Sequence, residues 1–229
     1  MKPFSAKTVW LFDLDNTLHD AGAWVFAQLH HSMGAYVERA LGLPTEQANQ
    51  LHSHYWQRYG ATLLGLVRHH GVKPAHFLDI THRLPGLEQR INGHRHDFAA
   101  LARLPGRKYI FTNAPRAYAL RVLGGLGIAH LFDGVISIED MRDFGHLRPK
   151  PDARMLRCMA VKLGVSPRRC VLVEDTLVHQ KSARKVGMGT VWMQRFARRG
   201  QHAGPTVARW LMRPAYVDKT VRGLRALTR

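Results

Sequence analysis

The chain contains five short apolar runs that end at or beside a polar residue, and this pattern restricts the fold more than any other feature. The runs are rich in β-branched and aromatic residues, which is typical of buried parallel strands. Helical stretches such as 115–125 and 152–163 separate most of them. Strands alternating with helices predict right-handed crossovers and an α/β fold, a Rossmann-like open parallel sheet that binds ligands beyond the carboxyl ends of its strands. The five runs are 8–13, 108–112, 134–138, 170–174 and 189–193.

The gap between the first two runs is far longer than one crossover and has a helical pattern throughout. Apolar residues recur at helical spacing over 23–41 and again over 46–70, and each stretch stops near a glycine and a proline. We therefore predict that a small all-helical cap domain is inserted into the sheet domain. The predicted boundaries are 20–105 for the cap, and 1–19 with 106–229 for the core.

After the fifth run the chain is basic and has little periodicity until an expected edge strand at 215–217 and a short closing helix over 218–227. The whole chain has 34 Lys and Arg against 16 Asp and Glu, a net charge of +18. Such a field attracts phosphorylated metabolites and equally nucleic acid. We expect no nucleic-acid partner, because no aromatic residues are interleaved with the basic ones. The arginines of this region are Arg195, Arg198, Arg199, Arg209 and Arg213.

The sequence also bears on the location of the protein. No apolar run approaches the ~18 residues that a membrane span requires, and the first residues lack the apolar stretch of a secretory signal. Cys158 and Cys170 have no metal-binding spacing and make no disulfide framework. We expect a soluble cytoplasmic protein with no membrane partner, either a monomer or a homodimer.

Two carboxylates, Asp13 and Asp15, follow the first apolar run directly. At the end of a buried strand both can face a ligand crevice. Like charges this close are tolerated when a cation neutralises them, and carboxylate oxygens are ligands that Mg²⁺ prefers. The alternative is an ordinary turn, since Asp and Asn favour turns and Thr17 could cap a helix. The pair alone does not decide between them.

Polar residues at later strand ends and at a helix start favour the first interpretation. In this order they resemble the motifs of the haloacid dehalogenase superfamily of phosphohydrolases: DxDxT, a strand-terminal Ser or Thr, a Lys and a terminal acidic pair. The resemblance covers almost the whole chain. An Asp at the first position together with Thr17 is typical of the phosphatases rather than the dehalogenases. The matching residues are Thr112-Asn113, Lys150 between two prolines, and Glu174-Asp175.

The resemblance implies a role for each residue. Asp13 would attack phosphorus to form an aspartyl-phosphate. Asp15 would protonate the leaving alcohol and then activate the water that hydrolyses this intermediate. Thr112, Lys150 and neighbouring amides, including that of Asn113, would bind the phosphoryl oxygens.

The resemblance also implies Mg²⁺ as the cofactor. The ion would be held by Asp13, the backbone carbonyl of Asp15, Glu174 and Asp175. His179 departs from the pattern, because an Asn or Asp often supports the metal site at that position.

In this superfamily the cap sets substrate specificity. The stretch with Tyr55, Arg58 and Tyr59 resembles the cap of pyrimidine 5′-nucleotidase-like members. A pyrimidine nucleoside requires an aromatic face for its base and donors for its oxygens. His19, just after DxDxT, is a further candidate for contact with the leaving group. Alternatively, Tyr55 and Tyr59 could pack a helix pair, as we expect of Trp56.

The combined prediction is a Mg²⁺-dependent phosphatase acting on nucleoside 5′-monophosphates, with pyrimidine nucleotides favoured. Two alternatives keep the same catalytic core: a phosphatase of sugar phosphates or phosphoglycolate, and a phosphoglucomutase-like phosphotransferase. A third is a basic scaffold that binds nucleic acid or a protein partner through 195–213, with a residual site.

Overall fold

The structure is a computed structural model that describes residues 4–22, 24–196 and 213–228. Contacts between residues divide the chain into two compact units, Met1–Gly22 with Ile91–Arg229, and Ala23–Arg90. Residues 91–105, which we assigned to the insertion, group with the first unit. The reason is helix α6 (Arg95–Arg103), which packs against the short helix η5 (Leu224–Leu227).

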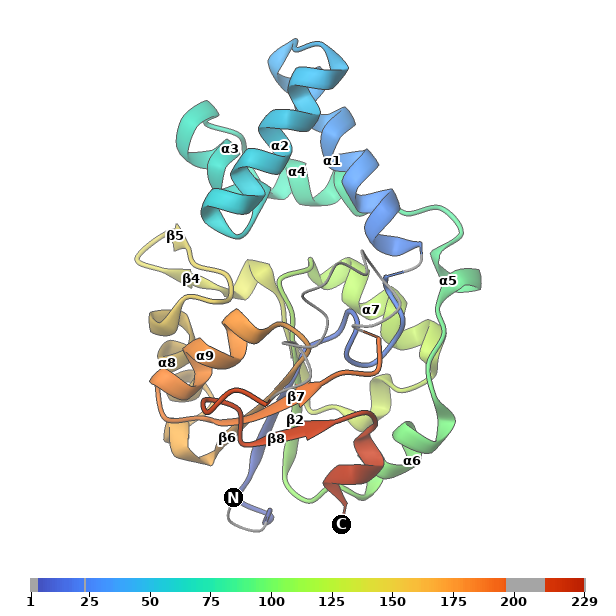
Figure 1. Cartoon of the computed structure of the whole chain (residues 1–229), viewed down its shortest axis with the longest axis vertical. Coiled ribbons are helices and arrows are strands. Elements are labelled where there is room, and N and C mark those ends of the chain that lie inside the picture. Colours follow the sequence, from blue (N-terminus) through green and yellow to red (C-terminus); the bar gives the residue numbers. More distant parts are fainter. Residues whose placement is uncertain (1–3, 23, 197–212, 229) are drawn as a thin grey trace. The chain divides into compact units, whose positions relative to one another are not determined.

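A six-stranded parallel sheet forms the centre of the first unit, in the order β3-β2-β1-β6-β7-β8 (Figure 1). This confirms the predicted α/β fold. In the register of the sheet, Phe12 pairs with both Ile110 and Val173. The residues that follow these three therefore emerge together at the carboxyl edge. The strands are β1 (Val9–Phe12), β2 (Arg107–Phe111), β3 (Gly134–Ile136), β6 (Cys170–Glu174), β7 (Gly189–Met193) and β8 (Lys219–Val221).

The last strand differs from the prediction of 215–217. Pro214 begins a turn, which closes through a hydrogen bond from the Val217 N–H to the Pro214 carbonyl. Pairing with β7 consequently begins at Lys219. The predicted helix over 218–227 is reduced to η5. A small antiparallel hairpin of β4 (Arg142–Asp143) and β5 (His146–Leu147) was not predicted.

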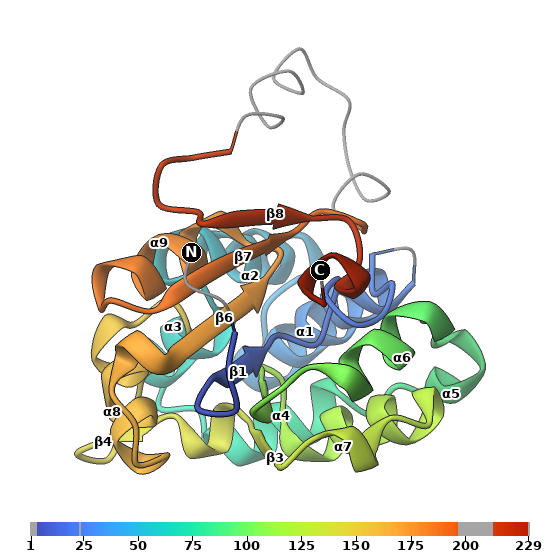
Figure 2. The ribbon, with the colours of Figure 1, turned by 90° about the horizontal axis from the view of Figure 1, so that it is seen from below.

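Helices cover both faces of the sheet (Figure 2). On one face, α8 (Ala153–Lys162) and α9 (Leu177–Lys185) bury a cluster that includes Leu11 and Leu172. On the other lie α6 and α7 (Arg116–Leu126). Successive side chains of a strand point to opposite faces of the sheet. Because all four residues of β1 are buried, β1 contributes side chains to the core on both faces. Besides η5, the described part of this unit contains the short 3₁₀ helices η1 (Ala129–Leu131), η2 (Ile138–Asp140) and η3 (Pro167–Arg169).

The second unit is all-helical in its described residues, as predicted for the insertion. One boundary differs: the stretch 46–70 forms two helices rather than one, because Gly60 takes a left-handed conformation with φ 76° and ends the first of them. The close packing of the two depends on Gly65, where any side chain would collide with the ring of Tyr55. The helices are α1 (Val25–Leu41), α2 (Thr45–Tyr59), α3 (Thr62–His70), α4 (Pro74–Thr81) and α5 (Leu87–Arg90).

Two further expectations can be compared with the structure. Within the described ranges, no helix combines the length and apolarity needed to cross a bilayer. Most of the basic segment 195–213, including Arg198, Arg199 and Arg209, lies outside the described residues.

Candidate active site

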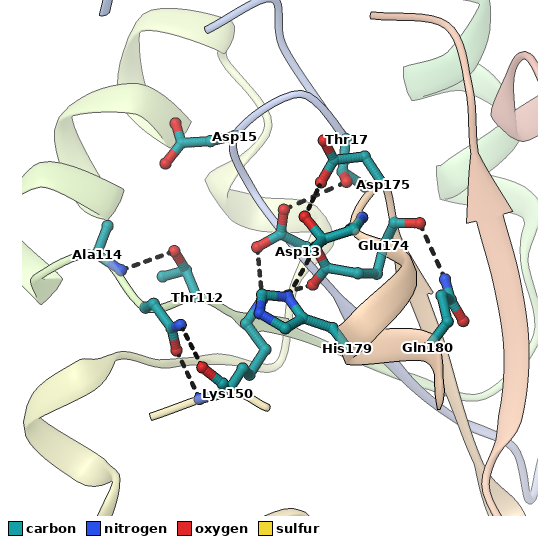
Figure 3. A network of polar contacts seen from close by, with 12 residues as sticks. Asp13, Asp15, Thr17, Thr112, Ala114, Lys150, Glu174, Asp175, His179 and Gln180 are labelled. Carbon is teal, nitrogen blue, oxygen red and sulfur yellow. Dashed lines mark hydrogen bonds and ion pairs between the residues drawn. The ribbon is translucent and has the colours of Figure 1, made fainter. Parts of the chain in front are cut away.

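The carboxylate of Asp13 and the ammonium group of Lys150 meet at the centre of the site (Figure 3). Asp13 follows β1, and its N–H donates to the Val173 carbonyl at 2.9 Å, which fixes it at the carboxyl edge of the sheet. Nζ of Lys150 lies 2.6 Å from Oδ1 of Asp13 and 2.7 Å from Oε2 of Glu174. Only 2% of Lys150 is exposed. A lysine this deeply buried requires such partners, because an unpaired buried charge is costly.

Asn113 determines where Lys150 sits. Its side-chain amide donates to the Lys150 carbonyl and its amide oxygen accepts from the Lys150 N–H, both at 2.9 Å. This pair joins the loop after β2 to the segment ahead of α8. The Asn113 side chain therefore orients the lysine rather than facing a ligand, and only the backbone amide of this residue remains for the phosphate contact that the sequence predicted.

Three carboxylates gather beside the lysine. Ligand oxygens of Asp13, Glu174 and Asp175 lie within 4.8 Å of one another, an arrangement that could hold a metal ion. The backbone of the acidic pair is fixed from β7 and α9: Nε2 of Gln180 donates to the Glu174 carbonyl at 2.9 Å, and the Trp192 indole donates to the Asp175 carbonyl at 2.8 Å.

His179, the departure from the family pattern, lies beside the carboxylate oxygen of Glu174 that Lys150 does not contact. Its Nδ1 is 3.1 Å from Oε1 of Glu174, an electrostatic contact that is not aligned as a hydrogen bond. The imidazole thus supports Glu174 and does not join the three grouped carboxylates.

The electrostatics of this cluster fit a cation. Burial, and then the charge of Glu174, raises the pKa of Asp13 to about 6, although Lys150 acts to lower it. Burial, and then the charges of Glu174 and Asp13, raise the pKa of Asp175 well above its ordinary value. Burial would raise the pKa of Glu174 too, but Lys150 and His179 outweigh it and hold that pKa low. One ammonium group does not balance three carboxylates, and hard oxygen donors suit Mg²⁺.

Two threonine hydroxyls border the cluster. Thr112 is buried at the end of β2, where its Oγ1 accepts from the Ala114 N–H at 3.0 Å. Its hydroxyl proton can thus be donated to another acceptor. Oγ1 of Thr17 donates to Oδ2 of Asp13 at 3.3 Å. Both oxygens of Asp13 therefore have fixed partners, Oδ1 on Lys150 and Oδ2 on Thr17.

Asp15 does not join the grouped carboxylates, and Figure 3 shows its carboxylate pointing away from them. Its Oδ1 accepts from the Tyr118 hydroxyl at 2.6 Å and from Nε2 of His19 at 2.8 Å. His19 is 0% exposed. This corrects the expectation that His19 touches the leaving group: the imidazole is enclosed and contacts Asp15 instead.

Within the second unit, the candidate substrate residues fall into two classes. Tyr55 is buried against Gly65, and its hydroxyl bonds Nε2 of His70 at 2.8 Å, so here it is a packing residue. Arg58 is exposed and donates to the hydroxyl of the half-buried Tyr59 at 3.2 Å. Trp56, expected in the core, is 63% exposed.

Sequence reasoning missed Tyr118 and Gln180. Tyr118 lies four residues before Val122 on α7, so it fits an apolar helix stripe, and Gln180 lies on a polar helix. A signal existed for each: a buried phenol or amide must find a hydrogen-bond partner, so both were candidates for a link to a neighbouring polar group.

Comparison with known proteins agrees with this arrangement. A model of the family described as haloacid dehalogenase-like hydrolase matches residues 8–187, more than half of the chain. The crystal structure of a HAD phosphatase from Thermococcus onnurineus superposes with a TM-score of 0.60 and 21% identity, covering 96% of this chain and 95% of that one. At this identity the likeness concerns the fold alone.

Two curated proteins are also similar in sequence. Phosphate metabolism protein 8 of Saccharomyces cerevisiae is 27% identical over 203 residues, which cover 82% of this chain and 62% of that protein. Fructose-1-phosphate phosphatase YqaB of Escherichia coli is 35% identical over 80 residues, 35% of this chain and 40% of that protein. The matched part of the chain thus spans less than two thirds of either relative's length.

Proposed function

The chain belongs to the haloacid dehalogenase-like hydrolases, and we propose that it is a Mg²⁺-dependent phosphatase that hydrolyses phosphate monoesters through an aspartyl-phosphate on Asp13. The observation that carries the proposal is the buried contact of Lys150 with both Asp13 and Glu174, beside Asp175. A carboxylate, a cation and a set of metal-type oxygens in one buried place are what phosphoryl transfer requires.

The proposed reaction has two steps. An oxygen of Asp13 bonds to phosphorus while the ester P–O bond breaks, and Asp15 gives its proton to the departing alkoxide. Asp15 then takes a proton from water, whose oxygen bonds to phosphorus as the bond to Asp13 breaks. Lys150 neutralises charge on the phosphoryl group and orients Asp13, while Thr112 and the amide of Asn113 bind phosphoryl oxygens.

Asp13, Glu174 and Asp175, with the backbone carbonyl of Asp15, would hold Mg²⁺. When bound, the ion supplies the positive charge that one lysine cannot provide to three carboxylates.

We propose the second unit as the cap that selects the substrate, with pyrimidine nucleoside 5′-monophosphates as the substrate class. Support comes from the resemblance of its second and third helices to nucleotidase caps, and from Arg58, Tyr59 and His69. Tyr59 hydroxyl and Nε2 of His69 lie 2.7 Å apart beside the exposed Arg58 guanidinium, which combines an aromatic face with donors. Tyr55 is not part of the proposed substrate contact, because its ring is buried.

A sugar phosphate is the second candidate. The observation in its favour is the similarity to the Escherichia coli protein that is named as a fructose-1-phosphate phosphatase. That match covers only about a third of this chain, so it weighs less than a resemblance in the cap itself.

A substrate panel tests both candidates. Phosphate release is measured with Mg²⁺ on UMP, CMP, AMP, fructose 1-phosphate and phosphoglycolate, and sugar-phosphate products are checked for isomers. We expect the highest kcat/KM for UMP or CMP, with no isomerised sugar. Equal or faster turnover of fructose 1-phosphate would refute the pyrimidine assignment.

A variant pair then tests the cap. Arg58→Gln should raise KM for UMP and leave that for fructose 1-phosphate unchanged. Arg39→Gln, which removes another exposed arginine of the same unit, is the matched control. Equal effects of both substitutions would contradict a substrate contact at Arg58.

A further inference from the structure

The carboxyl group of Asp15 is fixed through only one of its two oxygens. Oδ1 accepts both the Tyr118 hydroxyl at 2.6 Å and Nε2 of His19 at 2.8 Å. Across the described part of the chain, Oδ2 of Asp15 receives no hydrogen bond. The two oxygens of this side chain are therefore not equivalent.

Both donors are held rigidly. Tyr118 is 1% exposed in α7, the helix that follows the Thr112 loop, and His19 is fully buried. A backbone β-bridge joins the segments of Asp15 and His19. The hydroxyl of Tyr118 donates to Oδ1 of Asp15. A carboxylate oxygen only accepts, so the imidazole proton lies on Nε2.

This geometry has a chemical consequence. An oxygen that accepts two hydrogen bonds can do so whether the carboxyl group is ionised or protonated, because in the protonated form it is the carbonyl oxygen. The proton of the acid form must then lie on Oδ2. The same two donors therefore serve the acid step and the base step without rearrangement.

We propose that Tyr118 and His19 are positioning residues that reserve Oδ2 of Asp15 for proton transfer, an inference that rests on the proposed phosphatase function. As Asp13 bonds to phosphorus and the ester bond breaks, the Oδ2 proton passes to the leaving oxygen. Oδ2 then takes a proton from the attacking water as the aspartyl-phosphate bond breaks, which restores the starting state.

The test is the dependence on the leaving group. An alkoxide requires the proton from Asp15, whereas p-nitrophenolate leaves without it, and kcat/KM includes only the steps up to loss of the leaving group. The probes are p-nitrophenyl phosphate and whichever of UMP, CMP and fructose 1-phosphate the wild type hydrolyses fastest. Tyr118→Phe should lower kcat/KM for the alkyl ester by roughly 10- to 100-fold, since it removes a hydrogen bond to a charged group, and for p-nitrophenyl phosphate by less than about threefold.

A second pair of variants keeps the test valid even if Tyr118→Phe does not fold. His19→Leu should reproduce the selective loss, and His19→Gln, which keeps an N–H donor at similar reach, should recover most of it. Tyr109→Phe is the matched control, because Tyr109 is a half-buried tyrosine of β2. It should change kcat/KM for neither substrate.

Several outcomes would overturn the inference. An equal loss of kcat/KM for both esters would mean a merely structural role. If both Tyr118→Phe and His19→Leu left the ratio of kcat/KM for the alkyl ester to that for p-nitrophenyl phosphate unchanged, neither residue would position Asp15. If the wild type released phosphate from no ester, the proposed function would fail as well; an active wild type with parallel losses contradicts the positioning role alone.

Discussion

Nζ of Lys150 and Oε2 of Glu174 lie 2.7 Å apart with both side chains buried, so the lysine that contacts Asp13 is also tied to the strand beside it. Its single positive charge is shared between two carboxylates that emerge from β1 and β6. Removing the lysine would leave two carboxylates uncompensated in a place from which water is largely excluded.

Lys150→Met should therefore cost both stability and activity. Breaking a buried ion pair by removing one partner destabilises a protein by about 3–5 kcal/mol, because the remaining charge is uncompensated. Urea unfolding measures the loss, and phosphate release measures the activity. Lys185→Met, at an exposed lysine of α9, is the control and should stay within about 0.5 kcal/mol of the wild type. A Lys150→Met protein as stable as this control would refute the charge balance.

Mg²⁺ should stabilise the protein through the three grouped carboxylates. At 100 times its dissociation constant a ligand adds about 2.7 kcal/mol, which corresponds to a rise in Tm of roughly 5 to 10 °C for a chain of this size. Thermal unfolding with and without Mg²⁺ measures the shift. Asp175→Asn should abolish most of it, whereas Glu46→Gln, at an exposed carboxylate of α2, should retain it. An equal shift in Asp175→Asn would place the metal elsewhere.

Acidification should destabilise the helical unit through His52. Burial, and then the neighbouring His30, lowers the pKa of His52 from 6.5 to about 4. Between these values the unfolded chain binds the proton and the folded unit does not, so stability falls as the pH is lowered from about 6.5 to 4. We expect this residue to contribute about 1–2 kcal/mol to the loss of stability between pH 7 and pH 5.

His52→Gln supplies the comparison for that pH dependence. Unfolding in urea at pH 7 and pH 5 should show a smaller difference for the variant than for the wild type. A variant that loses as much stability as the wild type would assign the dependence to other groups.

Two glycine substitutions test the packing of α2 and α3. Gly65→Ala should destabilise the protein by about 1–3 kcal/mol, because the added methyl group would meet the buried ring of Tyr55. Gly124→Ala, at a helical glycine of α7 with open space around it, should instead stabilise by about 0.5–1 kcal/mol. Thermal or urea unfolding measures both, and a neutral Gly65→Ala would contradict the observed contact.

The sheet could be predicted from the sequence because its strands are short, apolar and buried on both faces, as Val9–Phe12 is. The meeting of Asp13 and Glu174 followed from the same pattern, since the ends of parallel strands share one edge. The third partner, Lys150, lies in a loop, and only the resemblance to a family indicated its place beside Asp13.

Other features could not be derived from the helical spacing of the sequence. Tyr118 fits the apolar stripe of α7, so nothing in its spacing indicated a hydrogen bond to Asp15 across 103 residues. Tyr55 and Trp56 are neighbours of similar chemistry, yet one is buried and the other exposed. That difference depends on how α2 turns toward α3 after the break at Gly60, which helical periodicity alone does not determine.

The central claim is that Asp13 is the nucleophile, and its most direct test is to find the phosphoryl group on that residue. The protein is quenched with acid during turnover of its best substrate, and the peptide that contains Asp13 is examined by mass spectrometry. We predict a peptide heavier by one phosphoryl group in the wild type, and neither this peptide nor phosphate release in Asp13→Asn. Turnover by Asp13→Asn equal to that of the wild type, or a phosphoryl group on another residue, would contradict the account.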